Sequence, residues 1–129
     1  MKKKTGGWRL CLDYRDLNKR MVSDGYPLPL LWPQLQEVAG HVWYVTLDCN
    51  WGVWNVPLEE GSKQYTALLT HKGTFEFNVV PFGIKNSPGE FQRAIDLVLS
   101  DLYGRGVYTY IDDIVIYADD VERVFELLG

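Results

Sequence analysis

Hydrophobic and polar positions along the chain follow two periods, which predicts strands in some segments and helices in others. Residues 8–14 alternate between apolar and polar side chains, a pattern typical of a half-buried strand. The β-branched and aromatic run 41–48 predicts a buried strand that ends at Asp48. Residues 65–80 predict a hairpin, with residues 71–73 in its loop.

Two segments in the middle of the chain carry the signals of helices. Pro33 lies near the start of a short predicted helix, and Gly40 lies beyond its end. A stronger helix begins at Ser87, where Pro88 and Glu90 complete a capping-box start. Its apolar side chains recur at helical spacing and precede a glycine that can stop the helix: Phe91, Ala94, Ile95, Val98, Leu99, Leu102 and Gly104.

The last third of the chain predicts a second hairpin and a final helix. The two strands of segment 107–117 are joined by adjacent aspartates, Asp112 and Asp113. A helix is expected from Asp119 or Asp120 to the end of the chain. This order of elements predicts an α+β fold, with helices packed on a mostly antiparallel sheet. Because the last helical pattern stops abruptly, we expect the chain to be a piece of something longer.

Composition narrows the class of protein. The 129 residues fit one domain of ordinary size, and 47% are hydrophobic and 23% charged. Apolar runs are short, so neither a transmembrane helix nor a membrane partner is expected. The basic N-terminus lacks a following apolar segment, which argues against a secretory signal. Cys11 and Cys49 show no ligand spacing, which favours a reducing, intracellular compartment.

The charge of the chain is unevenly distributed. The formal net charge of −4 argues by itself against a nucleic-acid-binding domain, which is usually basic. The first twenty residues, however, are rich in basic side chains: Lys2, Lys3, Lys4, Arg9, Arg15, Lys19 and Arg20. Acidic residues dominate the last third. The basic segment is therefore suited to phosphates and the acidic segment to cations.

Asp112 and Asp113 are the strongest chemical signal in these patterns. Two adjacent carboxylates need a cation or an altered pKa to coexist. Mg²⁺ prefers carboxylate oxygens, and Asp48 at the end of another strand is a candidate third ligand. Two such metal ions can activate the attacking oxygen and stabilise the leaving oxygen in phosphoryl transfer. The alternative is that Asp112 and Asp113 are ordinary solvated turn residues.

Four blocks of sequence resemble reverse transcriptases of gypsy-type long-terminal-repeat retrotransposons and retroviruses. They are "KKKTGGWRLCLDYRDLNKR", "VTLDCNWGVWNV", "THKGTFEFNVVPFGIKNSPGEFQR" and "YIDD". The blocks occur in the family's order and cover nearly the whole chain. The resemblance implies a partial domain over residues 1–129, with an RNA-recognition-like palm sheet, packed helices and part of the fingers. Segments 1–40 and 59–80 would be fingers-like, and 41–58 and 81–129 palm-like; thumb, connection and RNase H would lie on a longer polyprotein.

The resemblance also implies an activity, RNA-directed DNA polymerisation. A primer 3′-hydroxyl would attack the α-phosphate of a deoxynucleoside triphosphate, so the partners would be that nucleotide and an RNA or DNA primer–template. The catalytic and metal-binding residues would be Asp48, Asp112 and Asp113, with two Mg²⁺ ions or Mn²⁺ in their place. Asp48 and Asp112 would bridge the ions, and Asp113 would support them.

Further residues receive roles from the same resemblance. The expected nucleotide-binding residues are Arg9, Lys4 (or its neighbours Lys2 and Lys3), Cys49, Val53, Phe82 and Gly83. The expected primer–template residues are Tyr110 and Gln92. From the patterns alone, Arg9 would be a solvated side chain, each lysine could equally be one, and Phe82 could be a packed core residue.

One position departs from the family and leaves alternatives open. The family has a bulky aromatic residue where this chain has Val53, so weak discrimination against ribonucleotides is expected. The same substitution is also compatible with a decayed, inactive copy. The alternatives to an active polymerase are therefore a catalytically inactive retroelement remnant and a module that binds nucleic acid or a partner chain.

Overall fold

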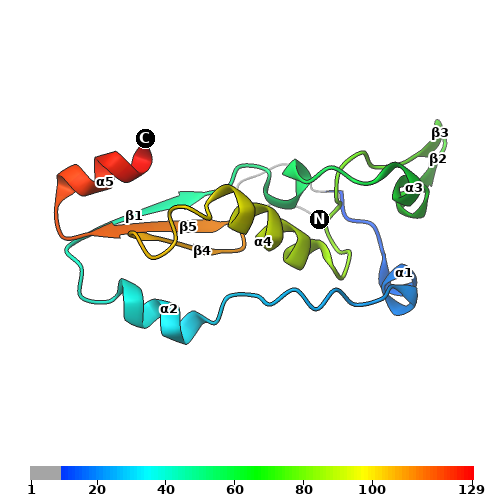
Figure 1. Cartoon of the computed structure of the whole chain (residues 1–129). Coiled ribbons are helices and arrows are strands. Elements are labelled where there is room, and N and C mark those ends of the chain that lie inside the picture. The colour runs from blue at the N-terminus through cyan, green and yellow to red at the C-terminus, as the bar shows by residue number, and fades with distance from the viewer. Residues whose placement is uncertain (1–9) are drawn as a thin grey trace. The chain divides into compact units, whose positions relative to one another are not determined.

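A three-stranded antiparallel sheet in the order β1-β5-β4 lies at the centre of one part of the chain (Figure 1). The computed structural model describes residues 10–129, and this first unit comprises 25–52 and 88–129. Its strands are β1 (Trp43–Asp48), β4 (Val107–Tyr110) and β5 (Asp113–Ala118). Because β1 and β4 both pair with β5, β5 is the central strand.

The hydrophobic core of this unit lies where the sheet meets the last helix, α5 (Val121–Leu128). Val107, Ile116 and Ala118 of the sheet are buried against Val124 of α5. Asp120 is the N-cap of α5, and its side chain accepts a hydrogen bond from the N–H of Arg123 at 2.7 Å. The predicted start of the last helix is therefore confirmed, and a capping carboxylate accounts for it.

Two further helices of the unit confirm predictions from the sequence. α2 (Leu31–Val38) is the short helix near Pro33, and the Tyr44 hydroxyl donates to its last carbonyl, that of Val38, at 3.1 Å. α4 (Ser87–Val98) is the helix predicted to begin at Ser87, with the strong apolar pattern; the Ser87 hydroxyl donates to the carbonyl of Pro81 at 3.3 Å. It ends before Leu99 and Leu102, which pack against the core from the following turn.

The second unit comprises residues 10–24 and 53–87 among those described. Its elements are α1 (Arg15–Arg20), η1 (Gly52–Asn55), α3 (Glu60–Lys63), η2 (Gln64–Thr66), β2 (Leu68–Thr70) and β3 (Gly73–Phe75). Of η1, the first residue, Gly52, is assigned to the first unit. β2 and β3 form the predicted hairpin, shorter than expected. The Asn18 side chain of α1 donates to the carbonyl of Gly83 and accepts from the N–H of Lys85, both at 2.8 Å.

Two strand predictions need correction. Residues 10–14 of the alternating segment form no strand; Leu10 is 57% exposed, and the Tyr14 carbonyl accepts from Asn18 N–H as α1 begins. Alternation produces a strand only where another strand pairs with it, and none does here. β1 ends at Asp48 as predicted but is not buried: it is an edge strand, and five of its six residues are exposed.

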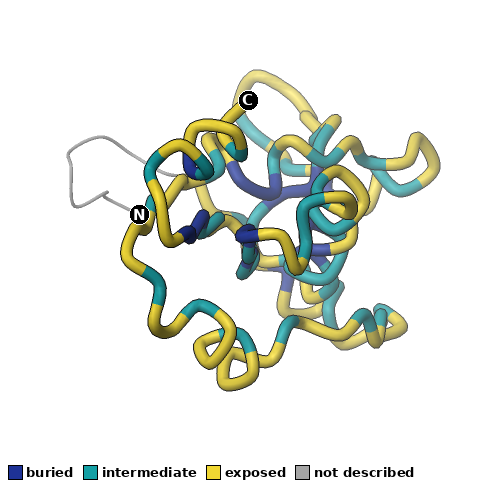
Figure 2. Tube along the Cα trace, turned by 60° about the vertical axis from the view of Figure 1, so that its left-hand side comes forward, coloured by how far each residue is buried: buried dark blue, intermediate teal, exposed yellow. Residues whose placement is uncertain are grey.

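Among residues 10–129, buried residues occur only in short stretches (Figure 2). Within residues 10–129, no helix has both the length and the apolar character needed to cross a membrane. Helices combined with an antiparallel sheet confirm the α+β class. The assignment of segments to fingers-like and palm-like parts stays a prediction.

Candidate active site

Asp48 and Asp113 are direct partners in the antiparallel pairing of β1 with β5. Asp113 is also the register partner of Tyr110 in β4, so Tyr110, Asp113 and Asp48 form one row across the sheet. Side chains of directly opposite residues point to the same face, with Cβ atoms about 4.5–5.5 Å apart. The two carboxylates therefore lie side by side at the end of the sheet where β1 ends and β5 begins.

Asp112 lies next to this pair, in the turn between β4 and β5. Its carbonyl accepts a hydrogen bond from the N–H of Cys49 at 2.8 Å, which extends the β1–β5 contact by one residue. Ile111, the residue before it, has φ 55. A left-handed conformation costs about 1–2 kcal/mol for a residue with a side chain, so the turn is strained.

Charge accumulates at this end of the sheet. Asp48, Asp112 and Asp113 are all exposed, and none forms an ion pair with a basic side chain among residues 10–129. Burial raises the pKa of the Cys49 thiol, and the negative charges of Asp112, Asp48 and Asp113 raise it further. All three carboxylates are thus close enough to act on one thiol.

The donor set suits a hard divalent cation, although the side chains are not arranged as a finished cage. In the described part of the chain, no group of three or more His, Cys, Asp or Glu side chains already has a metal-holding arrangement. Unpaired like charges repel each other in the absence of a cation, so an open arrangement is expected. Carboxylate oxygens on one row and the adjacent turn fit Mg²⁺ in ligand type and in backbone placement.

Gln92 does not lie where the sequence analysis placed it. Its side chain is 0% exposed, so it cannot contact a primer–template at the surface. Instead, its Oε1 accepts from the N–H of Ile111 at 2.8 Å, and its Nε2 donates to Asp96 and Thr109 at 2.8 and 3.1 Å. The resemblance to reverse transcriptases implied a primer–template contact for Gln92, but a buried polar network holds its side chain inside the unit.

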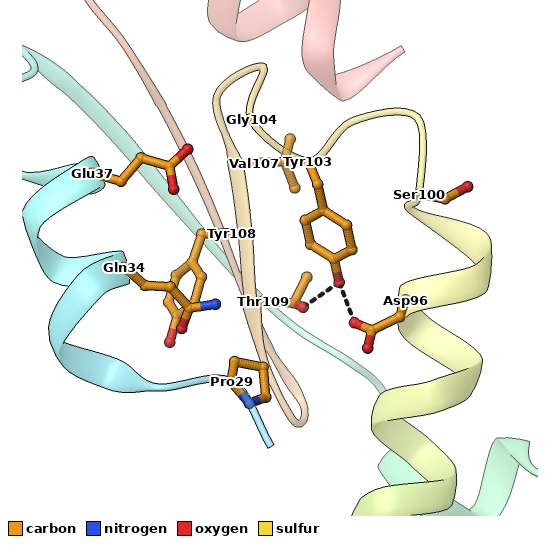
Figure 3. Close-up of a pocket in the computed structure, with 10 residues that line it drawn as sticks. All are labelled: Pro29, Gln34, Glu37, Asp96, Ser100, Tyr103, Gly104, Val107, Tyr108 and Thr109. Carbon is orange, nitrogen blue, oxygen red and sulfur yellow. Dashed lines mark hydrogen bonds between the residues drawn. The ribbon is translucent and has the colours of Figure 1, made fainter. Parts of the chain in front are cut away.

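Asp96 and Tyr103 belong to the same network and were not predicted from the sequence. Burial by itself would raise the pKa of Asp96, but hydrogen bonds from Tyr103, Tyr26 and Gln92 outweigh it and hold the pKa below its ordinary value. The Tyr103 hydroxyl lies between Asp96 and Thr109, at 2.6 Å from an oxygen of each (Figure 3). The only available signal was the i,i+4 spacing of Gln92 and Asp96 on one predicted helix.

A cavity of about 470 Å³ lies beside this cluster, along the outer edge of β4. Figure 3 shows Gln34 and Glu37 of α2 on one side of β4 and Asp96 of α4 on the other. Tyr103 and Thr109 line the cavity together with them.

Three of the predicted nucleotide-binding residues, Val53, Phe82 and Gly83, belong to the second unit. Val53 is 8% exposed, and the Phe82 ring packs against Trp54 with ring centroids 5.2 Å apart. Gly83 has φ +94, a conformation that favours glycine, and its carbonyl is held by Asn18. Arg9 and Lys4 lie outside the described residues. The binding roles of all these residues stay predictions, as does the primer–template role of half-buried Tyr110.

Comparison with known proteins gives a consistent result. Residues 1–128 match the family model described as reverse transcriptase (RNA-dependent DNA polymerase). The chain is 34% identical over 112 residues to the retrovirus-related Pol polyprotein from transposon gypsy of Drosophila melanogaster, covering 87% of this chain and 11% of the polyprotein. It is 35% identical over 109 residues to an RNA-directed DNA polymerase homolog of Oenothera berteroana, covering 84% of this chain and 77% of that protein.

A solved structure agrees with these sequence relatives. The foamy viral protease–reverse transcriptase, solved in complex with an RNA/DNA hybrid, superimposes with a TM-score of 0.79 at 27% identity. The match covers 94% of this chain and 16% of the foamy viral chain. The chain therefore spans a small part of the viral protein and of the transposon polyprotein.

Proposed function

The chain belongs to the reverse transcriptase (RNA-dependent DNA polymerase) family, and from this premise we propose that Asp48, Asp112 and Asp113 form a nucleotidyl-transfer centre. In the proposed reaction, a primer 3′-hydroxyl oxygen attacks the α-phosphate of a deoxynucleoside triphosphate. The new P–O bond forms as the bond to pyrophosphate breaks. The observation that supports this most directly is the register that sets Asp48 opposite Asp113, with Asp112 adjacent.

The reverse transcriptase family is generally dependent on divalent metal ions, and we propose two Mg²⁺ ions, or Mn²⁺, for this chain. When bound, such ions lower the pKa of the attacking hydroxyl and neutralise charge on the phosphate. Asp48 and Asp112 hold them through carboxylate oxygens, and Asp113 adds negative charge beside them. Because all three side chains are exposed, a triphosphate and a primer end can reach them. The work of these residues is positioning and charge compensation.

The proposed partners are a primer–template of RNA or DNA and a deoxynucleoside triphosphate. The foamy viral relative, which was solved with an RNA/DNA hybrid, supports the first of these. Tyr110 shares the row of Asp113 and Asp48, which supports its proposed contact with the primer–template. The resemblance of the sequence blocks to reverse transcriptases is the basis for the proposed nucleotide-binding residues: Arg9, Lys4, Cys49, Val53, Phe82 and Gly83.

A primer-extension assay with the 129-residue chain tests the proposal. We expect Mg²⁺- or Mn²⁺-dependent addition of single nucleotides to a primer on an RNA template, abolished by Asp112→Asn and by chelator. Asp101→Asn is the matched control, since it removes the same charge from an exposed residue in the loop before β4, away from the carboxylate turn. Long products are not expected, because affinity for nucleic acid depends largely on phosphate contacts and this chain has a net charge of −4.

The outcomes of this assay separate the alternatives. Metal binding without nucleotide addition at any primer concentration would indicate an inactive remnant and contradict the proposal. Binding of single-stranded nucleic acid that persists in Asp112→Asn and in chelator, again without addition, would indicate a binding module instead.

A further inference from the structure

The turn that carries Asp112 is held from outside the hairpin. Ile111 adopts φ 55, a region that β-branched residues rarely occupy. Such strain persists only where surrounding structure over-determines it. The N–H of Ile111 donates to Oε1 of Gln92, 19 residues earlier in the chain, at 2.8 Å. A side chain of α4 therefore fixes the backbone of the residue directly before Asp112.

The orientation of the Gln92 amide is set by its partners. A backbone N–H can only donate, so the group facing Ile111 is the amide oxygen. The carboxylate of Asp96 can only accept, so the group facing it is the amide nitrogen. The second hydrogen of that nitrogen points to the Thr109 hydroxyl oxygen. Gln92 thus uses its oxygen and both amide hydrogens, and it is completely buried.

Asp96 anchors this arrangement with several short hydrogen bonds. One carboxylate oxygen accepts from Gln92 and from the Tyr103 hydroxyl, and the other accepts from the Tyr26 hydroxyl at 2.6 Å. Since the single proton of Tyr103 goes to Asp96, the Thr109 hydroxyl donates to the Tyr103 oxygen (Figure 3). Every donor and acceptor in the chain of contacts from Tyr26 to Ile111 is therefore matched.

We infer that Gln92 is a positioning residue for the carboxylate turn: its amide, anchored by Asp96 and Thr109, holds Ile111 so that Asp112 and Asp113 are presented beside Asp48. The catalytic importance of this role rests on the proposed function, whereas the hydrogen bond itself does not. Burying an amide is unfavourable unless its hydrogen bonds are made, and a fully satisfied buried network specifies one geometry. An apolar residue of similar size could fill the space but could not hold the Ile111 N–H.

Amide hydrogen exchange on the metal-free, ¹⁵N-labelled 129-residue chain tests the inference. In Gln92→Met, which keeps side-chain length and removes the acceptor, we expect the Ile111 amide to exchange about tenfold or more faster than in the wild type, after normalisation to Val115 and Ile116 in the central strand. Gln92→Glu keeps an acceptor oxygen for Ile111 but sets a second carboxylate against Asp96, so protection should fall throughout the unit while Ile111 keeps its protection relative to Val115 and Ile116. Thr109→Val is the matched control, since it removes a contact of the Gln92 nitrogen and leaves the acceptor.

A role in packing alone predicts a different result. All amides would then lose protection together, and Gln92→Met would resemble Gln92→Glu and Thr109→Val. That outcome would overturn the inference. If Gln92→Met fails to fold, a measurement on the wild type tests the same hydrogen bond. A scalar coupling through it should be detected by NMR between the Ile111 nitrogen and the Gln92 side-chain carbonyl carbon. Its absence, in a spectrum that detects such couplings within β4–β5, would refute the contact.

Mn²⁺ affinity, measured on the same variants, connects the contact to the carboxylates. We expect Gln92→Met to weaken Mn²⁺ binding about tenfold, and Gln92→Glu and Thr109→Val to weaken it less. Unchanged affinity in a Gln92→Met protein that has lost Ile111 protection would refute the positioning role. If the wild type binds no Mn²⁺, the proposed function fails, and the positioning role fails with it; the exchange data then establish only the hydrogen bond to Ile111.

Discussion

Asp48 of the edge strand β1 lies directly opposite Asp113 of the central strand β5, so the sheet sets two carboxylates against each other at one end of this pair of strands. Like charges directly opposite in an antiparallel pair are destabilising. A cation-binding role gives a physical reason for this arrangement.

The first prediction concerns this repulsion. Asp113→Asn should raise the free energy of unfolding of the metal-free chain by about 0.2–1 kcal/mol, because it removes one charge of an opposed pair. Urea denaturation in chelator measures the change, with Asp101→Asn as the charge-matched control. Added Mg²⁺ should stabilise the wild type and should stabilise Asp113→Asn less. A loss of stability in Asp113→Asn in chelator would mean that the pair is not repulsive.

The second prediction concerns the close approach of Gly106 to β5. A Cβ atom at Gly106 would lie 2.7 Å from the Tyr117 carbonyl oxygen and 2.9 Å from Leu127 Cδ1, and its φ is +104. Gly106→Ala should therefore destabilise the chain by about 2 kcal/mol or more. The alanine would be strained at this positive φ, and its Cβ would overlap the Tyr117 carbonyl oxygen.

Two other glycines serve as controls for Gly106→Ala. Gly104 has φ +70 and no atom within 4 Å of a built Cβ, so Gly104→Ala should cost only the left-handed strain, about 1 kcal/mol. Gly25 has neither feature, so Gly25→Ala should be neutral or slightly stabilising. Equal midpoints for the three variants in thermal unfolding would contradict the described path of the chain around Gly106.

The third prediction is a loss of stability at high pH. Burial raises the pKa of Tyr117 to about 12, and its hydrogen bond to Glu37 adds to the effect. The unfolded chain releases this proton near pH 10, while the folded chain retains it. The contribution of protonated Tyr117 to the free energy of unfolding is therefore complete below about pH 10 and is lost as the pH rises towards about 12.

Tyr117→Phe tests the assignment of this alkaline transition. The variant should be less stable than the wild type at pH 8, because the hydrogen bond to Glu37 is gone, yet its stability should fall less steeply between pH 10 and 12. Tyr103, whose pKa burial also raises to about 12, should retain part of the slope. Parallel stability curves for the two proteins from pH 8 to 12 would exclude Tyr117 as a contributor.

The fourth prediction concerns sugar selection at Val53. If this position contacts the nucleotide sugar, the wild type should incorporate ribonucleotides readily, and Val53→Phe should reduce that incorporation relative to deoxynucleotides. Because Val53 is 8% exposed, the larger ring costs about 1–3 kcal/mol of stability, and folding of the variant must be checked. Strong preference of the wild-type chain for deoxynucleotides would contradict the prediction.

Local chemistry explains which elements were predictable from the sequence. Asp120 caps α5, and the apolar spacing after Ser87 forms α4, because caps and helical periodicity act within a few residues. The alternation in 10–14 gave a wrong strand, since no neighbouring strand pairs with it. A strand needs a partner from elsewhere in the chain, which a local pattern does not specify.

In the candidate site too, local patterns predicted some features, and contacts between distant parts of the chain determined the rest. Asp48 was selected because it ends a strand, and the sheet register sets it opposite Asp113. That register depends on pairing between β1 and β5, which are 65 residues apart at this pair, and no local pattern determines it. The resemblance to reverse transcriptases gave Gln92 a primer–template role, whereas its actual partners are Thr109 in a later strand and Ile111 in the turn after it. The burial of Gln92 arises only when α4 packs against these later residues.

The most direct test of the account is a Mn²⁺ titration of the 129-residue chain, followed by electron paramagnetic resonance. We predict saturable binding by the wild type and by Asp101→Asn, weakened about tenfold or more by Asp48→Asn, Asp112→Asn and Asp113→Asn, with Mg²⁺ competing for the same site. Equal affinity in all five proteins, or no saturable binding by the folded wild type in the presence of a deoxynucleoside triphosphate, would contradict a shared metal site at these three carboxylates.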